Sequence, residues 1–118
     1  MLTLASVEQP ARWHTGAMFE PALPEISVTQ IPDDGYLIDV REEHEWASGH
    51  APTAVFLPMS QIAARVAEVP RDRTVYLVCA GGVRSAEVGQ WLAQQGFEAV
   101  NVSGGMMAWA GAGLPIVT

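Results

Sequence analysis

The sequence predicts an α/β fold in three layers, in which helices cover both faces of a central, mainly parallel sheet of about five strands. Short apolar runs of strand length alternate with segments whose apolar residues recur at helical spacing, which is typical of βαβ units. The run 74–78 is apolar or β-branched throughout, as expected for a strand buried on both faces of a parallel sheet. Because crossovers between parallel strands are right-handed, we expect ligands to bind beyond the carboxyl ends of the strands.

Each predicted element follows from local signals along the chain. The predicted strands are residues 26–31, 36–40, 55–57, 74–78 and 99–102. The predicted helices are residues 42–48, 60–69, 85–95 and 105–110. The first strand is edge-like because apolar and polar residues alternate in it. Ser60 is the expected cap of the second helix, and Trp46 is the expected anchor of the first helix to the core.

Length and composition indicate one domain. The chain has 118 residues, of which 49% are hydrophobic, which is enough for one core and too short for two. Residues 1–24 contain scattered prolines and show no hydrophobic period, so we expect an amino-terminal arm that lies on the domain or is partly disordered. The folded domain is expected to span residues 25–118.

Charge and cysteine content exclude several classes of function. Six arginines and no lysine oppose thirteen acidic residues, and a net charge of -7 argues against nucleic acid or an anionic membrane as a partner. The single cysteine, Cys79, excludes an internal disulfide or a dithiol motif and favours a reducing cytoplasm. No apolar run has transmembrane length. The three histidines share no metal-ligand spacing, so neither a metal nor another cofactor is expected.

The segment 79–85 carries the strongest chemical signal. Cys79 ends a buried strand, and Gly81 and Gly82 lead into a helix that starts at Ser85. Free N–H groups at a helix start favour an anion, and glycines let those groups turn inward. The alternatives are an inert buried thiol and an ordinary strand-to-helix turn. A reactive Cys79 requires that its sulfur be open to solvent and that the neighbouring amides face it.

Two arginines are candidate cations for this site. Arg84 offers a planar guanidinium suited to an oxyanion, although it could instead pair with Glu87, three residues on. Arg41 follows the strand 36–40 and could support the loop from beneath or pair with Asp39. For His50, which precedes a proline-containing turn, we expect a hydrogen bond to the backbone.

Three segments of the chain form one combined motif. The first is the cysteine loop, and the second joins Leu37-Ile38-Asp39-Val40-Arg41 to Glu45-Trp46-Ala47-Ser48-Gly49-His50-Ala51-Pro52. The third joins Val102-Ser103-Gly104-Gly105-Met106-Met107-Ala108-Trp109 to Gly113-Leu114-Pro115. Together these segments resemble the rhodanese family, in the order and at the spacing of a small single-domain member. Thr53 departs from the pattern, which usually has glycine there.

The resemblance implies a sulfurtransferase in which the Cys79 thiolate takes a sulfane sulfur from a donor such as thiosulfate. It would hold that sulfur as a persulfide and pass it to cyanide, a thiol or an acceptor protein. The residues expected to bind the donor anion are Ala80, Gly81, Gly82, Val83, Arg84 and Ser85, with Arg41 as possible support.

Two other functions stay open. A cysteine-dependent phosphatase or arsenate reductase of the related fold also surrounds an anion with cysteine and arginine, but those enzymes resemble Cys-x5-Arg. Here four residues separate Cys79 from Arg84. A sulfur-relay or protein-binding module would keep the domain and turn over small donors slowly. A redox sensor is a weaker alternative because the chain has no resolving thiol.

Overall fold

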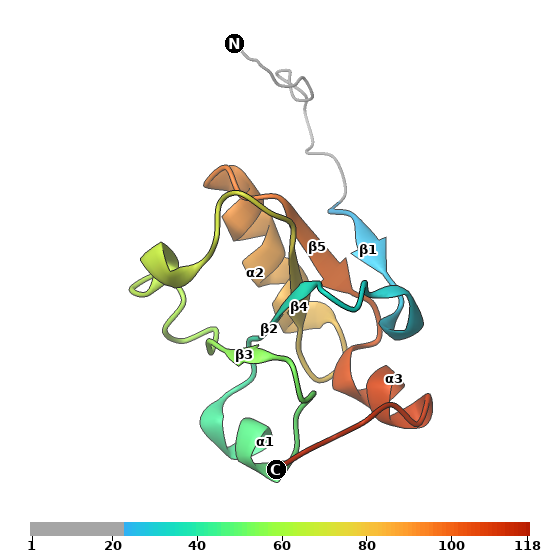
Figure 1. Ribbon diagram of the computed structural model, residues 1–118. Helices are drawn as coiled ribbons and strands as arrows, with labels where there is room; N and C mark the ends of the chain where they lie inside the picture. The colour runs from blue at the N-terminus through green and yellow to red at the C-terminus, as the bar shows by residue number, and fades with distance from the viewer. Residues whose placement is uncertain (1–22) are drawn as a thin grey trace.

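The computed structural model describes residues 23–118, which form a five-stranded parallel sheet with helices around it (Figure 1). The strands are β1 (Glu25–Ile26), β2 (Tyr36–Asp39), β3 (Val55–Phe56), β4 (Val75–Val78) and β5 (Ala99–Val102). The helices are α1 (Glu43–Ser48), α2 (Val83–Gln94) and α3 (Gly105–Gly111), with the 3-10 turns η1 (Val28–Gln30) and η2 (Val66–Glu68). The strand order is β1-β5-β4-β2-β3. Apart from its last two residues, the predicted arm over residues 1–24 lies outside the described residues.

Two hydrophobic cores lie on opposite faces of the sheet and confirm the predicted three-layer α/β fold. Successive residues of a strand point to opposite faces, so Leu77 belongs to one core and Val78 to the other. The Leu77 core includes Leu92 of α2, whereas the Val78 core includes Trp109 of α3. Each central strand is therefore covered on both faces.

The strand order brings the predicted site to the middle of the sheet. β4 pairs in parallel with both β2 and β5, so its carboxyl end is flanked by the ends of two other strands. Cys79 follows β4 directly, and Arg41 comes shortly after β2 in a segment whose Val40 N–H donates to the Val78 carbonyl at 3.0 Å. The carboxyl edge of the sheet thus holds both residues.

The predicted helix over residues 60–69 is wrong. Turns occupy most of this segment, and η2 is its only regular element. Ser60 does not cap a helix, since turns follow it, and its hydroxyl donates to Glu42 Oε1 at 2.8 Å. Ile62 and Val69 are nevertheless buried in the Leu77 core, so the spacing identified the buried side chains correctly.

The first strand is shorter than predicted. β1 ends at Ile26, and residues 28–30 form η1, where the expected strand over 26–31 would have continued. The side chain of Gln30 accepts the Ser27 N–H at 3.3 Å, which closes the turn locally. β1 does lie at an edge of the sheet, as its alternating pattern indicated.

Trp46 does not anchor α1 to a core. Its side chain is half-buried and belongs to neither hydrophobic cluster. The indole stacks on the imidazole of His50, with ring centroids 3.5 Å apart, and lies 5.0 Å from the ring of Phe56. Stacking on His50 and Phe56 therefore takes the place of the expected packing of Trp46 in a core.

Candidate active site

The loop after β4 enters α2 through a left-handed glycine. Gly82 is the N-cap of α2 with φ +106°, a conformation that side chains with a Cβ rarely adopt. The helix begins at Val83, earlier than the predicted start at Ser85. Ser85 therefore lies in the first turn, where backbone N–H groups have no partner within the helix. Those N–H groups are available to an anion beside the loop.

Four donors act on the sulfur of Cys79. The Gly82 N–H donates to Sγ at 3.1 Å and the Ser85 hydroxyl at 3.2 Å. Burial raises the pKa of the Cys79 thiol, but the Ser85 hydroxyl and the N–H groups of Ser85, Gly82 and Gly81 outweigh it, so the pKa lies below its ordinary value. These donors favour the thiolate, which is the nucleophilic form.

The sulfur is covered, contrary to what the sequence-based interpretation required. Cys79 is 1% exposed, so the expectation of a thiol open to solvent is wrong. Its neighbours in the loop are accessible, since Val83 is 73% exposed and Gly81 is also exposed. The thiol thus lies beneath an exposed rim formed by its own loop.

The amino terminus of α3 holds the backbone of the cysteine loop. The N–H groups of Met106 and Met107 donate to the carbonyls of Cys79 at 2.7 Å and Ala80 at 3.0 Å. In a trans peptide the N–H points opposite to the C=O, so both bonds turn the N–H groups of Ala80 and Gly81 away from α3. The first turn of α3 therefore orients the peptide groups that precede the helix α2.

Gly105 permits this close approach. A Cβ on Gly105 would lie 2.4 Å from the Cys79 carbonyl oxygen and 2.6 Å from that of Ala80. Sequence reasoning did not foresee that the backbone N–H groups of Met106 and Met107 would bind the cysteine loop. The glycine pair Gly104-Gly105 was the available signal, because consecutive glycines after a strand indicate close contact between backbones.

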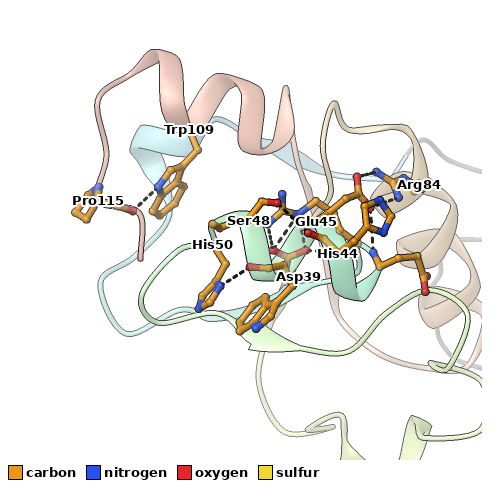
Figure 2. A network of polar contacts seen from close by, with 12 residues as sticks. Asp39, His44, Glu45, Ser48, His50, Arg84, Trp109 and Pro115 are labelled. Atoms are coloured by element: carbon orange, nitrogen blue, oxygen red, sulfur yellow. Dashed lines mark hydrogen bonds and ion pairs between the residues drawn. The ribbon is translucent and has the colours of Figure 1, made fainter. Parts of the chain in front are cut away.

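Arg84 is paired with a residue that the sequence did not suggest. Its guanidinium donates to both carboxylate oxygens of Glu45, at 2.9 and 2.8 Å, and Figure 2 shows the two side chains pointing toward one another. The proposed alternative partner, Glu87, is not involved in this pair. The hydrogen bond from Arg84 lowers the pKa of Glu45 from 4.5 to about 2, and the same contact raises the pKa of Arg84. The pair joins α2 to α1 beside the loop.

Arg41 forms its hydrogen bonds outside the cysteine loop. Its guanidinium pairs with the buried carboxylate of Asp39 at 2.8 Å, which confirms one of the two expectations for these residues, and also donates to the Gly49 carbonyl at 2.7 Å. Arg41 therefore ties the end of β2 to the turn after α1. His50 Nδ1 lies 2.8 Å from the Trp46 carbonyl oxygen, so the expected backbone hydrogen bond is present (Figure 2).

Within residues 23–118, no three His, Cys, Asp or Glu side chains gather closely enough to hold a metal ion. Over the same range, no helix is both long enough and apolar enough to cross a membrane.

The fold and the loop define a class of α/β domain that carries a cysteine between a central parallel strand and a helix amino terminus. The chain belongs to the rhodanese-like domain family, whose model matches residues 26–112, and this confirms the resemblance seen in the sequence. It is 45% identical over 86 residues to a sulfurtransferase of Allochromatium vinosum, covering 72% of this chain and 80% of that protein.

Solved structures show the same fold. A rhodanese-like domain protein from Staphylococcus aureus is 36% identical with a TM-score of 0.71, covering 81% of this chain and all of that one. A NAD-dependent persulfide reductase from A. fulgidus is 32% identical with a TM-score of 0.64, covering 75% of this chain and 16% of that one. The domain therefore occurs both as a whole protein and as a small part of a larger one.

Proposed function

We propose that this protein moves a sulfane sulfur from thiosulfate, or from another persulfide donor, to a thiophilic acceptor through a persulfide on Cys79. Its family and its 45% identity to a sulfurtransferase support sulfur transfer of the rhodanese type. One observation carries the assignment of Cys79: its sulfur accepts hydrogen bonds from the Gly82 N–H at 3.1 Å and the Ser85 hydroxyl at 3.2 Å. Such donors stabilise a negative sulfur, both as the attacking thiolate and as the later persulfide anion.

The reaction divides into two displacements at sulfur. In the first, the Cys79 thiolate attacks the outer sulfur of thiosulfate, a new S–S bond forms, and sulfite leaves with the electron pair of the broken S–S bond. In the second, cyanide or a thiolate attacks the outer persulfide sulfur, and the electron pair of that bond returns to Cys79. Because the enzyme carries the sulfur between the two steps, ping-pong kinetics are expected.

The loop residues 80–85 would hold the sulfonate of the donor. The N–H groups at the start of α2 are the donors that an anion prefers, and the helix dipole adds to their effect. Arg84 supplies a cation whose orientation is set by Glu45, so the guanidinium is ordered before a donor arrives. Arg41 would act indirectly, by holding the turn at Gly49.

Intact-mass spectrometry after incubation with thiosulfate tests the proposal. The wild-type protein should gain one sulfur atom and lose it on treatment with a reductant or with cyanide. A Cys79→Ser variant should gain none, and since Cys79 is the only cysteine in the chain, the site of addition is unambiguous. A wild-type protein that stays unmodified by thiosulfate and by a persulfide donor alike would refute the proposal.

The burial of Cys79 favours one alternative, a sulfur-relay module that turns over only with a partner protein. A thiol that is 1% exposed needs its rim to open, and docking of a partner could supply that opening. The two functions differ in steady-state assays. Rapid turnover of thiosulfate and cyanide supports the enzyme, whereas single loading with slow turnover, accelerated by a protein persulfide donor, supports the relay.

A further inference from the structure

Asn101 is a buried polar side chain in β5, and each of its polar atoms is hydrogen-bonded. The residue is 1% exposed. Its Nδ2 group donates to the Gly82 carbonyl at 3.1 Å and to Glu25 Oε2 at 2.9 Å. Its Oδ1 atom accepts the Ser85 hydroxyl at 2.6 Å. Since a buried amide costs free energy unless it is hydrogen-bonded, this set of bonds ties β5 firmly to the cysteine loop.

The partners of Nδ2 determine how the amide is oriented. A backbone carbonyl such as that of Gly82 can only accept, so the NH2 end of Asn101 must face it. Oδ1 is then directed at Ser85, where it can only accept. The hydroxyl of Ser85 must therefore be the donor in this 2.6 Å contact.

Ser85 has one hydroxyl proton and two acceptors within reach. Its Oγ lies 2.6 Å from Asn101 Oδ1 and 3.2 Å from Cys79 Sγ. A hydroxyl donates one hydrogen bond of full strength at a time, so the amide oxygen and the sulfur compete for it. The shorter contact is the one to Asn101.

We propose that Asn101 is a positioning residue for Cys79 that acts through the single hydroxyl proton of Ser85. The proton rests on Asn101 Oδ1 while the sulfur is neutral and turns to the sulfur when the sulfur becomes negative. The inference rests on the proposed function in taking Cys79 as the nucleophile, and it identifies a residue that controls how strongly the nucleophile is stabilised.

The competition has a chemical purpose. A thiolate that is stabilised too strongly is abundant but a poor nucleophile, because nucleophilicity falls as the thiol pKa falls. By drawing on the same proton, Asn101 limits the stabilisation that Ser85 gives to the thiolate.

Charged groups near this set come from three other elements and stay constant in the test. Glu25 of β1 contacts Asn101 directly. Arg84 of α2 interacts electrostatically with Cys79 and is itself bonded to Glu45 of α1. Substitutions at residues 85 and 101 leave all three in place, so changes in thiol reactivity report on the hydroxyl proton.

The test is a double-mutant cycle read by the rate of alkylation of Cys79 by iodoacetamide as a function of pH. Alkylation reports on Cys79 alone, because the chain has no other cysteine. Ser85→Ala removes a donor to the thiolate and should slow alkylation at pH below the thiol pKa by about tenfold. Asn101→Leu frees the Ser85 proton for the sulfur. The midpoint of the alkylation rate against pH should therefore move to lower pH, and alkylation below the wild-type midpoint should become about threefold faster.

The double variant shows whether Asn101 acts through Ser85. Asn101→Leu in the Ser85→Ala background should change nothing further, because the proton that it releases is absent. An Asn101→Leu protein with a midpoint at higher pH, or the same shift in both backgrounds, would show that Asn101 only holds the loop and would overturn the inference. Ser103→Ala, which removes an exposed hydroxyl just after β5 and changes no charge, is the matched control and should keep the wild-type midpoint.

A second measurement needs no substitution at residue 101, in case that variant does not fold. The side-chain amide NMR signal of Asn101 should shift with the ionisation of Cys79 in the wild type and should lose that titration in Ser85→Ala. An Asn101 amide signal whose chemical shift does not change as Cys79 titrates would overturn the inference. Neither readout involves a sulfur donor, so failure of the proposed function and failure of this inference are seen separately.

Discussion

Two strand-to-helix turns in this protein share a backbone design and differ in what their amides contact. One turn joins β4 to α2 and the other joins β5 to α3, and each has a glycine with positive φ at the helix N-cap, Gly82 at +106° and Gly104 at +78°. In the first turn the N–H groups face the sulfur of Cys79. In the second, two N–H groups donate to the carbonyls of the first turn.

The difference shows that a glycine-rich helix start has no function of its own. A helix start offers unpaired donors, and the acceptor that packing brings to them decides whether they serve chemistry or structure. Here the α3 turn stabilises the α2 turn, since its N–H groups donate hydrogen bonds to the carbonyls of Cys79 and Ala80. The following substitutions separate the two turns.

Gly105→Ala should have the largest effect, because its Cβ would lie 2.4 Å from the Cys79 carbonyl oxygen and its φ is +60°. The backbone must move apart, so we expect a loss of about 3 kcal/mol in the free energy of unfolding and loss of sulfur loading. Urea unfolding and intact-mass loading measure the two effects. Gly111→Ala, in the same helix with nothing within 4 Å of the added Cβ, is the control. Equal unfolding midpoints for the two variants would contradict the bracing role of α3.

Gly82→Ala should come second. The substitution puts a side chain at φ +106° and a Cβ 3.3 Å from the Gly104 N atom, so we expect a loss of about 1–2 kcal/mol in the free energy of unfolding. Gly81→Ala is the matched control, since nothing lies within 4 Å of its Cβ and its change should stay within about 0.5 kcal/mol. If both variants lost the same stability, the requirement for glycine would not lie at the N-cap.

Arg84→Ala tests the cation, which the α3 turn lacks. We expect the thiosulfate concentration at half-maximal loading rate to rise about tenfold, equivalent to about 1.4 kcal/mol of lost anion binding. Arg65→Ala removes an equal charge from an exposed pair with Glu68 and should leave that concentration unchanged. The same donor dependence for Arg84→Ala and wild type would mean that Arg84 only joins α2 to α1.

Glu45→Gln should have the smallest effect on stability at neutral pH. The ion pair keeps the pKa of Glu45 at about 2, below 4.5, so its stabilisation is complete above about pH 4.5 and is lost as the pH falls toward 2. The Arg84 side chain is 36% exposed, and screening by solvent reduces the expected loss to about 1 kcal/mol at pH 7. Thermal unfolding from pH 7 to pH 2 should show a shallower acid decline in the variant than in the wild type. Parallel declines would contradict the assigned pKa.

Local patterns in the sequence determined most of the fold. The strand 99–102 was predicted at its exact bounds, and the apolar run 74–78 placed Cys79 at the carboxyl end of a buried strand. Strands and turns of this kind can be predicted because hydrophobic period, glycines and residue order are visible within a short stretch of sequence. The segment 60–69 was the exception, since the contact of Ser60 with Glu42, 18 residues away, replaced a helix cap.

Only the tertiary structure decided how the site is completed. Glu45 meets Arg84 across 39 residues, and Asn101 meets Gly82 across 19 and Glu25 across 76. The amides of α3 likewise reach the cysteine loop from a segment that meets it only in the packed domain. Hydrogen bonds between distant segments leave no periodic trace in a sequence, because each requires only that two suitable groups arrive at the same place. The strand order of the sheet brings them there.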